Sequence, residues 1–160
     1  MNDLKNDASE LPPQRGPLPP VYFLLAIVGM IALHRYTPVA HWLDWPWRWL
    51  GLAPLVTGVG LAILANRQFA RHGTTVKPHG PSSAVVTDGA FSLSRNPMYF
   101  GMLLVLTGEW ILLGSMSPVV IIPLHAVIMT KLFIEMEETK MERLLGQEYL
   151  DYKSRVRRWI

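Results

Sequence analysis

A polar-to-apolar transition at residues 92–101, SLSRNPMYFG, contains a first group of residues that could do chemistry. Asn96 stands directly before Pro97. Asparagine before a helix accepts a backbone N–H, and proline fits the first helical position, so this pair predicts a helix N-terminus. The free N–H groups and the positive dipole end of such a helix suit an anionic or polar group of a ligand.

A second group is acidic and follows later in the chain: Glu135, Glu137, Glu138 and Glu142. One interpretation is a solvated helix face, with an attractive Lys131–Glu135 pair and a repulsive Glu138–Glu142 pair. Glu137 and Glu138 point about 100° apart on a helix, so one can face the bundle and the other solvent. An inward carboxylate needs ligand hydroxyls or a cation as its partner. We expect Glu137 to face inward and a Glu138→Ala change to be tolerated.

Two further polar residues interrupt apolar segments. Glu109 follows Arg95 by about 21 Å of helix rise, so we expect it to lie far from the first group and to be structural. An ionisable group in the membrane is nevertheless a functional candidate by default. For His125 an interhelical hydrogen bond is favoured over the role of catalytic base.

Several kinds of site are excluded or unsupported. The chain has no cysteine, which excludes disulfides, thiolate metal sites and cysteine nucleophiles. HExxH, GxSxG and Walker motifs are absent from the sequence. The histidines lack the spacing of metal ligands, so we expect no metal; they are His34, His41, His72, His79 and His125.

The apolar segments must position these groups. Half of the 160 residues are apolar, and with their flanks the apolar runs cover residues 21–36, 49–66, 97–114 and 118–136. Their lengths approach the roughly 20 residues that cross a bilayer, and they lack the polar face of a soluble helix. The sequence therefore predicts an all-α integral membrane bundle of four transmembrane helices. Residues 1–20, polar and rich in proline, are expected to be a disordered tail.

The charges of the loops predict an orientation. With four spans, most basic residues lie on the side of both termini and of the loop 67–97, whereas the other side has Arg35 and Arg48. The positive-inside rule then makes both termini cytoplasmic. We expect residues 67–97 to form a cap over the cytoplasmic mouth of the bundle, in a bacterial-type inner (plasma) membrane.

The C-terminal segment QEYLDYKSRVRRWI follows Gly146, a plausible end of the preceding helix. Its aromatic and basic residues alternate at helical spacing, which predicts an amphipathic helix over residues 147–160. Two arrangements remain open: the helix lies on an anionic membrane surface, or it packs on the bundle. Anionic lipid is nearer than nucleic acid, so no nucleic-acid partner is expected.

Three pieces in register resemble the membrane methyltransferase family of isoprenylcysteine carboxyl methyltransferases and phospholipid N-methyltransferases. VVTDGAFSLSRNPMYFG is similar to the family's L-V-T-x-G-x-Y-x-x-x-R-(H/N)-P-x-Y-x-G. The pair Glu137-Glu138 ends the following hairpin, and LLGQEYLDYKSRVRRWI resembles F-G-x-x-Y-x-x-Y-x-x-x-V-x-R. The resemblance covers roughly residues 69 to 160.

This resemblance implies a cytoplasmic cap that binds S-adenosylmethionine and a lipid-facing opening for a hydrophobic or amphipathic acceptor. Glu137, as the first Glu of the pair, would bind the polar end of the cofactor. The implied cofactor-binding residues are Ser83, Ala84, Val85, Val86, Phe91, Asn96, Pro97, Met98, Tyr99 and Glu137. The catalytic residue stays unassigned, with Arg95, Asn96, Tyr99 and His125 as candidates.

The sequence departs from the family pattern in ways that leave the acceptor open. Phe91 stands where the family usually has Tyr, and Asn96 replaces the His of prenylcysteine enzymes. Phe133 occupies the position of an Arg that serves a substrate carboxylate, for which Lys131 or Arg95 could substitute. The alternative to an enzyme is a non-catalytic four-helix membrane protein that binds lipid or a partner. The oligomeric state is also open.

Overall fold

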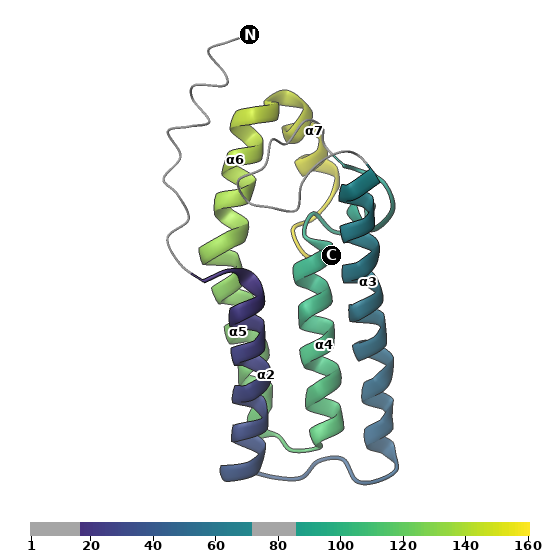
Figure 1. The fold of residues 1–160 in the computed structure, drawn as a ribbon, viewed down its shortest axis with the longest axis vertical. Helices are drawn as coiled ribbons and strands as arrows, with labels where there is room; N and C mark the ends of the chain where they lie inside the picture. Colours follow the sequence, from purple (N-terminus) through teal and green to yellow (C-terminus); the bar gives the residue numbers. More distant parts are fainter. Residues whose placement is uncertain (1–16, 72–85) are drawn as a thin grey trace.

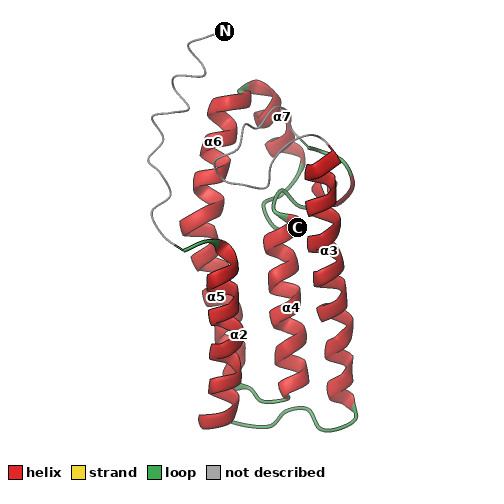
Figure 2. Ribbon diagram, in the orientation of Figure 1, coloured by secondary structure: helices red, strands yellow, loops and turns green. Residues whose placement is uncertain are grey.

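The computed structural model describes residues 17–71 and 86–160 and shows helical rods standing side by side (Figures 1 and 2). These residues contain no strand, which confirms the all-α prediction. The first rod is α2 (Pro19–Tyr36), the second is η2 (Trp47–Gly51) with α3 (Leu52–Arg71), and the third is α4 (Pro97–Leu113). The last comprises η4 (Ser117–Val120), α5 (Ile121–Met129), the π-helical η5 (Thr130–Ile134) and α6 (Glu135–Leu145). Short η3 (Gly89–Ser92) precedes α4, and α7 (Gln147–Arg155) follows α6.

The boundaries follow the local chemistry closely. α2 begins at Pro19, because proline is accepted in the first helical turn, two residues before the expected start. Residues 1–16 of the expected tail and residues 72–85 of the expected cap lie outside the described residues. Gly146 ends α6 with a positive φ of 53°, as its position in the sequence predicted.

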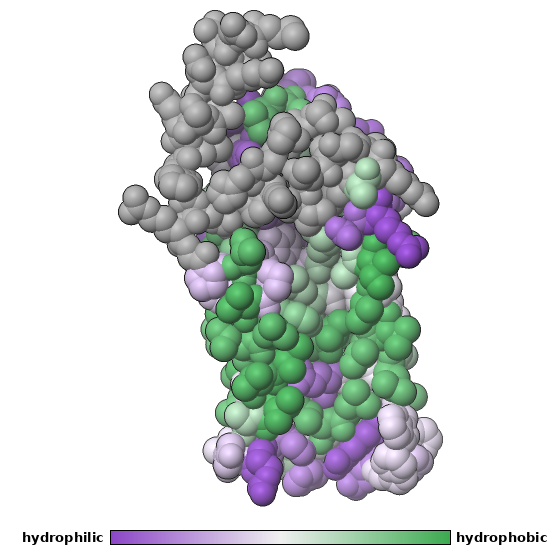
Figure 3. Space-filling model, viewed as in Figure 1, coloured by the Kyte–Doolittle hydropathy of each residue, from purple (hydrophilic) through white to green (hydrophobic). Residues whose placement is uncertain are grey.

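Three helical stretches are long and apolar enough to cross a membrane: Pro19–Tyr36, Trp47–Gln68 and Ser117–Leu145. The apolar α4 has 17 residues and rises about 25 Å, slightly less than the roughly 30 Å of a hydrocarbon core. On the face that Figure 3 shows, an apolar band covers the middle of the rods, with hydrophilic residues at its lower end and at the right above it. A helical bundle that spans a membrane is therefore the architecture, with α4 as its shortest rod.

Helices α3 and α4 approach at backbone distance through glycines. A Cβ on Gly58 would lie 2.4 Å from the carbonyl oxygen of Gly101, and one on Gly51 would lie 2.4 Å from that of Gly108. Small residues are the means by which membrane helices come this close. Because the two helices are antiparallel, this seam holds the start of α4 beside the end of α3 (Figure 1).

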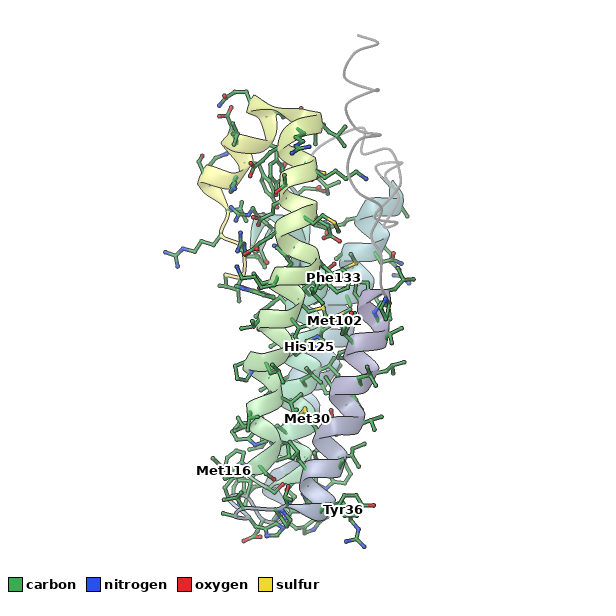
Figure 4. The ribbon with its side chains drawn as sticks, turned by 90° about the vertical axis from the view of Figure 1, so that its left-hand side faces the viewer. Met30, Tyr36, Met102, Met116, His125 and Phe133 are labelled. Atoms are coloured by element: carbon green, nitrogen blue, oxygen red, sulfur yellow. The ribbon has the colours of Figure 1, made fainter. Side chains whose placement is uncertain are left out.

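The buried residues form three layers. The lowest contains Ala26, Met30 and Leu106, the middle one Tyr99, Met129, Phe133 and Ile134, and the highest Ala65, Val86, Ala90, Phe91, Tyr149 and Tyr152. Figure 4 shows Met30, His125, Met102 and Phe133 following one another along the bundle toward its upper end. The candidate site lies where the middle and highest layers meet.

The prediction of a helix over residues 147–160 is wrong in its second part. α7 ends at Arg155, and Val156 is extended, with φ −117° and ψ 131°. The Arg95 guanidinium donates to the carbonyls of Lys153 and Val156, at 2.9 and 3.1 Å. These bonds satisfy carbonyls at the end of α7, as basic side chains do at helix C-termini, and the last residues turn back to α4.

Candidate active site

The site is built around the first turn of α4, with α6 on one side and the chain's last residues on the other. Figure 1 shows the C-terminus at the start of α4. Asn96 occupies the N-cap position and Pro97 the first helical position, as the sequence predicted. The site therefore begins at a helix start that is flanked by α6 and by the last residues of the chain.

The expected capping role of the Asn96 side chain is wrong. No side-chain hydrogen bond caps α4 in the described part of the chain. The Asn96 amide Nδ2 instead donates to the carbonyl of Arg158 at 3.1 Å, and the Asn96 backbone N–H donates to Ser94 Oγ at 3.1 Å. In the absence of a side-chain acceptor among the described residues, the first-turn N–H groups of α4 are uncapped.

Tyr99 connects this turn to α6. Its hydroxyl donates to Glu137 Oε1 at 2.8 Å, and its ring stacks on Phe133 with centroids 6.5 Å apart. Tyr99 is 6% exposed, so the hydrogen bond is shielded from water on the tyrosine side. Tyr99 and Glu137, which the resemblance implies would both bind the cofactor, thus contact each other directly.

The other acids of α6 have cationic partners. Glu135 pairs with Lys131 at 2.7 Å, the predicted i,i+4 pair, and Glu142 pairs with Lys153. Within the described residues, Glu137 accepts a hydrogen bond from the neutral Tyr99 hydroxyl, and the Lys140 charge lies near enough to attract its carboxylate. A carboxylate has about four acceptor positions, and Tyr99 occupies one of them. Glu137 thus retains capacity for further donors.

The expected outward face of Glu138 is also wrong. Glu138 is 4% exposed and lies between two guanidinium groups. Arg95 donates to its Oε1 at 3.0 Å, and Arg158 donates through Nε at 3.2 Å and Nη2 at 2.7 Å. The hydrogen bonding of Arg158 to Glu138 is the main cause that raises the pKa of Arg158. A buried carboxylate with two arginine partners is a structural ion cluster, and its loss will not be tolerated.

The apolar residues that the resemblance implies for cofactor binding are packed against protein side chains. Val86 and Phe91 are buried at 4% and 5% exposure in the highest layer, against Tyr149 and Tyr152. Tyr152 donates its hydroxyl to the Phe91 carbonyl at 2.7 Å, and burial raises the pKa of Tyr152 to about 12, so it remains a donor. Ser83, Ala84 and Val85 lie outside the described residues.

Met98 and Tyr99 extend the site into two layers. Met98 packs against the highest layer and Tyr99 belongs to the middle one. Successive residues of the first turn of α4 therefore contact the cluster of Phe91 on one side and that of Phe133 on the other. Pro97 is fully buried and fixes the beginning of this turn.

Two of the candidate catalytic residues do not meet at the site: Arg95 is already paired, and His125 lies away from the start of α4. Arg95 is held by Glu138 and by carbonyls of α7, as described above. His125 lies in the apolar part of the bundle, below Met102 and Phe133 in Figure 4, with its ring 6.0 Å from that of Phe23. Its Nε2 has no hydrogen-bond partner in the described chain, so the expected interhelical bond through this atom is not formed. Both oxygens of Glu109 are likewise buried without a partner among these residues.

Comparison with protein families then gives one match. A model described as phospholipid methyltransferase matches residues 46–148, more than half of the chain. The chain belongs to the phospholipid methyltransferase family. Comparisons with curated proteins and with solved structures gave no match. Membership supports a membrane methyltransferase, and the matched range includes the start of α4, Tyr99 and the Glu137-Glu138 pair.

The sequence of this phospholipid methyltransferase family member did not predict which residues support the site. Ser94, Glu138 and Arg158 all bind groups at or beside Asn96. Gln68 was missed as well: it accepts from the Ala90 N–H and donates to the Asp88 carbonyl, which joins the end of α3 to η3. The position of Arg95 directly before a helix start was the available signal in the sequence; the structure buries its side chain to 8% exposure, and a buried guanidinium requires a carboxylate partner.

Proposed function

We propose that this protein is an S-adenosylmethionine-dependent methyltransferase that acts on a hydrophobic or amphipathic acceptor at the cytoplasmic membrane face. The observation that carries the proposal is the Glu137 carboxylate, which faces Tyr99 at the uncapped start of α4. A carboxylate with spare acceptor positions next to free backbone donors offers both kinds of polar partner that this zwitterionic, ribose-containing molecule needs.

The donor set fits the cofactor by its chemistry. Glu137 would accept from ribose hydroxyls or from the ammonium group, while Tyr99 holds the carboxylate in one orientation at 2.8 Å. The first-turn N–H groups of Met98 and Tyr99 would donate to an anionic group. When bound, the cofactor supplies a methyl group on an electrophilic sulfonium. The described residues contribute by binding and by positioning, since in-line transfer depends mainly on alignment.

The surroundings favour an acceptor without a carboxylate. Phe133, at the position of the substrate-binding Arg in prenylcysteine enzymes, is 3% exposed and packs beside Tyr99. The cations considered as substitutes are already paired: Lys131 with Glu135, and Arg95 with Glu138. An amine-bearing phospholipid is therefore the better acceptor, and it would reach the site from the bilayer.

The proposal includes four spans with both termini in the cytoplasm of a bacterial-type inner (plasma) membrane. It is supported by the basic residues at the site's end of the bundle and by the exposed aromatic residues at the other. Trp45, Trp47 and Trp49 are more than half exposed there, as expected for side chains at a membrane interface.

The test is a transfer assay on protein in detergent or vesicles, with radiolabelled S-adenosylmethionine. Acceptors are an amine phospholipid, a prenylcysteine analogue and a lipid without an amine. We expect label in the amine phospholipid alone. Label in the prenylcysteine analogue alone would overturn the acceptor class. No label in any acceptor, together with no cofactor binding, would favour the non-catalytic membrane protein.

A further inference from the structure

The last residues of the chain contact the candidate site through their main chain. The Arg157 carbonyl accepts from the Arg95 N–H at 3.0 Å. The Arg158 carbonyl accepts from both Ser94 Oγ and Asn96 Nδ2, each at 3.1 Å. The orientation of the Asn96 amide is therefore set by the tail.

The Arg158 side chain reaches the other half of the site. Its guanidinium engages both oxygens of Glu138, the residue next to Glu137 on α6. Such a two-point contact fixes direction as well as distance. Arg95 binds the same carboxylate, so α4, α6 and the tail meet at one buried charge.

Trp159 completes the contact. It packs against the middle layer, which contains Tyr99 and Phe133. Within three residues the tail thus touches Asn96 by a carbonyl, Glu138 by a guanidinium and the Tyr99 layer by an indole. The family match ends at residue 148, so the tail residues of this arrangement lie beyond the matched region, whereas their partners lie within it.

We propose that Arg158 is a positioning residue for the cofactor site, which it holds together by fixing Asn96 through its carbonyl and the Glu137-bearing turn through Glu138. The inference rests on the proposed function. Without the Arg158 guanidinium, Arg95 is the remaining ion-pair partner of Glu138 among the described residues. The turn of α6 that contains Glu137 can then shift relative to Tyr99.

The experiment measures binding of S-adenosylhomocysteine to wild type, Arg158→Gln, Arg158→Lys and the control Arg155→Gln. Arg155 is exposed on α7 and carries the same charge. We expect about tenfold weaker binding for Arg158→Gln, the loss of one charge-assisted contact. The affinity of Arg158→Lys should lie between those of wild type and Arg158→Gln, because lysine keeps the charge but lacks the planar guanidinium that can bind both carboxylate oxygens. Arg155→Gln should bind like wild type.

A second measurement needs no cofactor. Hydrogen exchange of the backbone amides of Arg95, Asn96, Met98 and Tyr99 should be faster in Arg158→Gln and unchanged in Arg155→Gln. If wild type fails to bind, the proposed function fails, and exchange still tests the role of the tail. If wild type binds and Arg158→Gln binds equally well, with a lower Tm as its only defect, Arg158 is merely structural and the inference is overturned.

Discussion

The two ends of α4 are fixed by different kinds of contact. At the Gly114 end, main-chain bonds combine with side-chain bonds to carbonyls: the Trp42 N–H donates to the Gly114 carbonyl at 3.0 Å, and the Trp110 Nε1–H donates to the Ser115 carbonyl at 2.9 Å. At the Asn96 end, charged and polar side chains from α6 and the tail converge. Among the described residues, this second end combines a partly satisfied carboxylate with an uncapped helix start, which is why we propose it as the place of the ligand.

The first prediction concerns the ion cluster at the Asn96 end of α4. Glu138→Ala should lower the free energy of unfolding by about 3–5 kcal/mol, because it leaves the buried Arg95 guanidinium with its carboxylate partner removed. Thermal unfolding in detergent measures this loss. Glu148→Ala, an exposed acid on α7, is the control. Equal Tm values for the two variants would show that the ion cluster does not stabilise this end.

The second prediction concerns the seam that joins the two ends. Gly58→Ala places a Cβ 2.4 Å from the Gly101 carbonyl and should destabilise by about 1–3 kcal/mol through overpacking. Gly60→Ala is the matched control on the same helix, since nothing lies within 4 Å of its added Cβ. Unfolding curves of the two should separate. A neutral Gly58→Ala would mean that α3 and α4 are farther apart.

The third prediction separates binding from folding. Tyr99→Phe removes the hydroxyl that orients Glu137 and should weaken cofactor binding about tenfold, the value of a hydrogen bond to a charged group. Titration with S-adenosylhomocysteine measures it. Tyr149→Phe, in the layer beneath α7, should bind nearly as wild type. The reverse ranking would move the pocket toward α7.

The smallest effect on stability is expected at the Gly114 end of α4. Ser115→Ala removes the contact of Ser115 Oγ with His34 Nδ1, 2.8 Å long, at a cost of about 1 kcal/mol of stability. Cofactor affinity should not change, because the site lies at the other end of α4. A loss of binding in this variant would contradict the assignment of the ligand to one end.

The sequence predicted the features that depend on neighbouring residues. The helix start at Asn96-Pro97 and the helix end at Gly146 each need only local conformational preferences. The direction of the Asn96 amide depends instead on Arg158, 62 residues away. Burial of Glu138 likewise needs Arg95, 43 residues before it. Helical periodicity cannot show which of two adjacent glutamates meets such a partner.

The expected C-terminal helix illustrates the same limit. Tyr149 and Tyr152 stand at helical spacing as the pattern indicated, and α7 packs on the bundle through them, which is one of the two arrangements that the sequence left open. The pattern continues to Trp159, yet the helix stops because Arg95 binds the last carbonyls and the tail finds partners on α4. Long-range hydrogen bonds override periodicity where they are available.

The central claim is that Glu137, facing Tyr99 at the start of α4, binds the methyl donor. Titration of S-adenosylhomocysteine into wild type and Glu137→Gln, each shown to be folded by its Tm, tests it most directly. We predict saturable binding to wild type and loss of at least about tenfold in affinity for Glu137→Gln, since the amide removes the charge and one acceptor oxygen. Equal affinity of the two proteins would contradict the account.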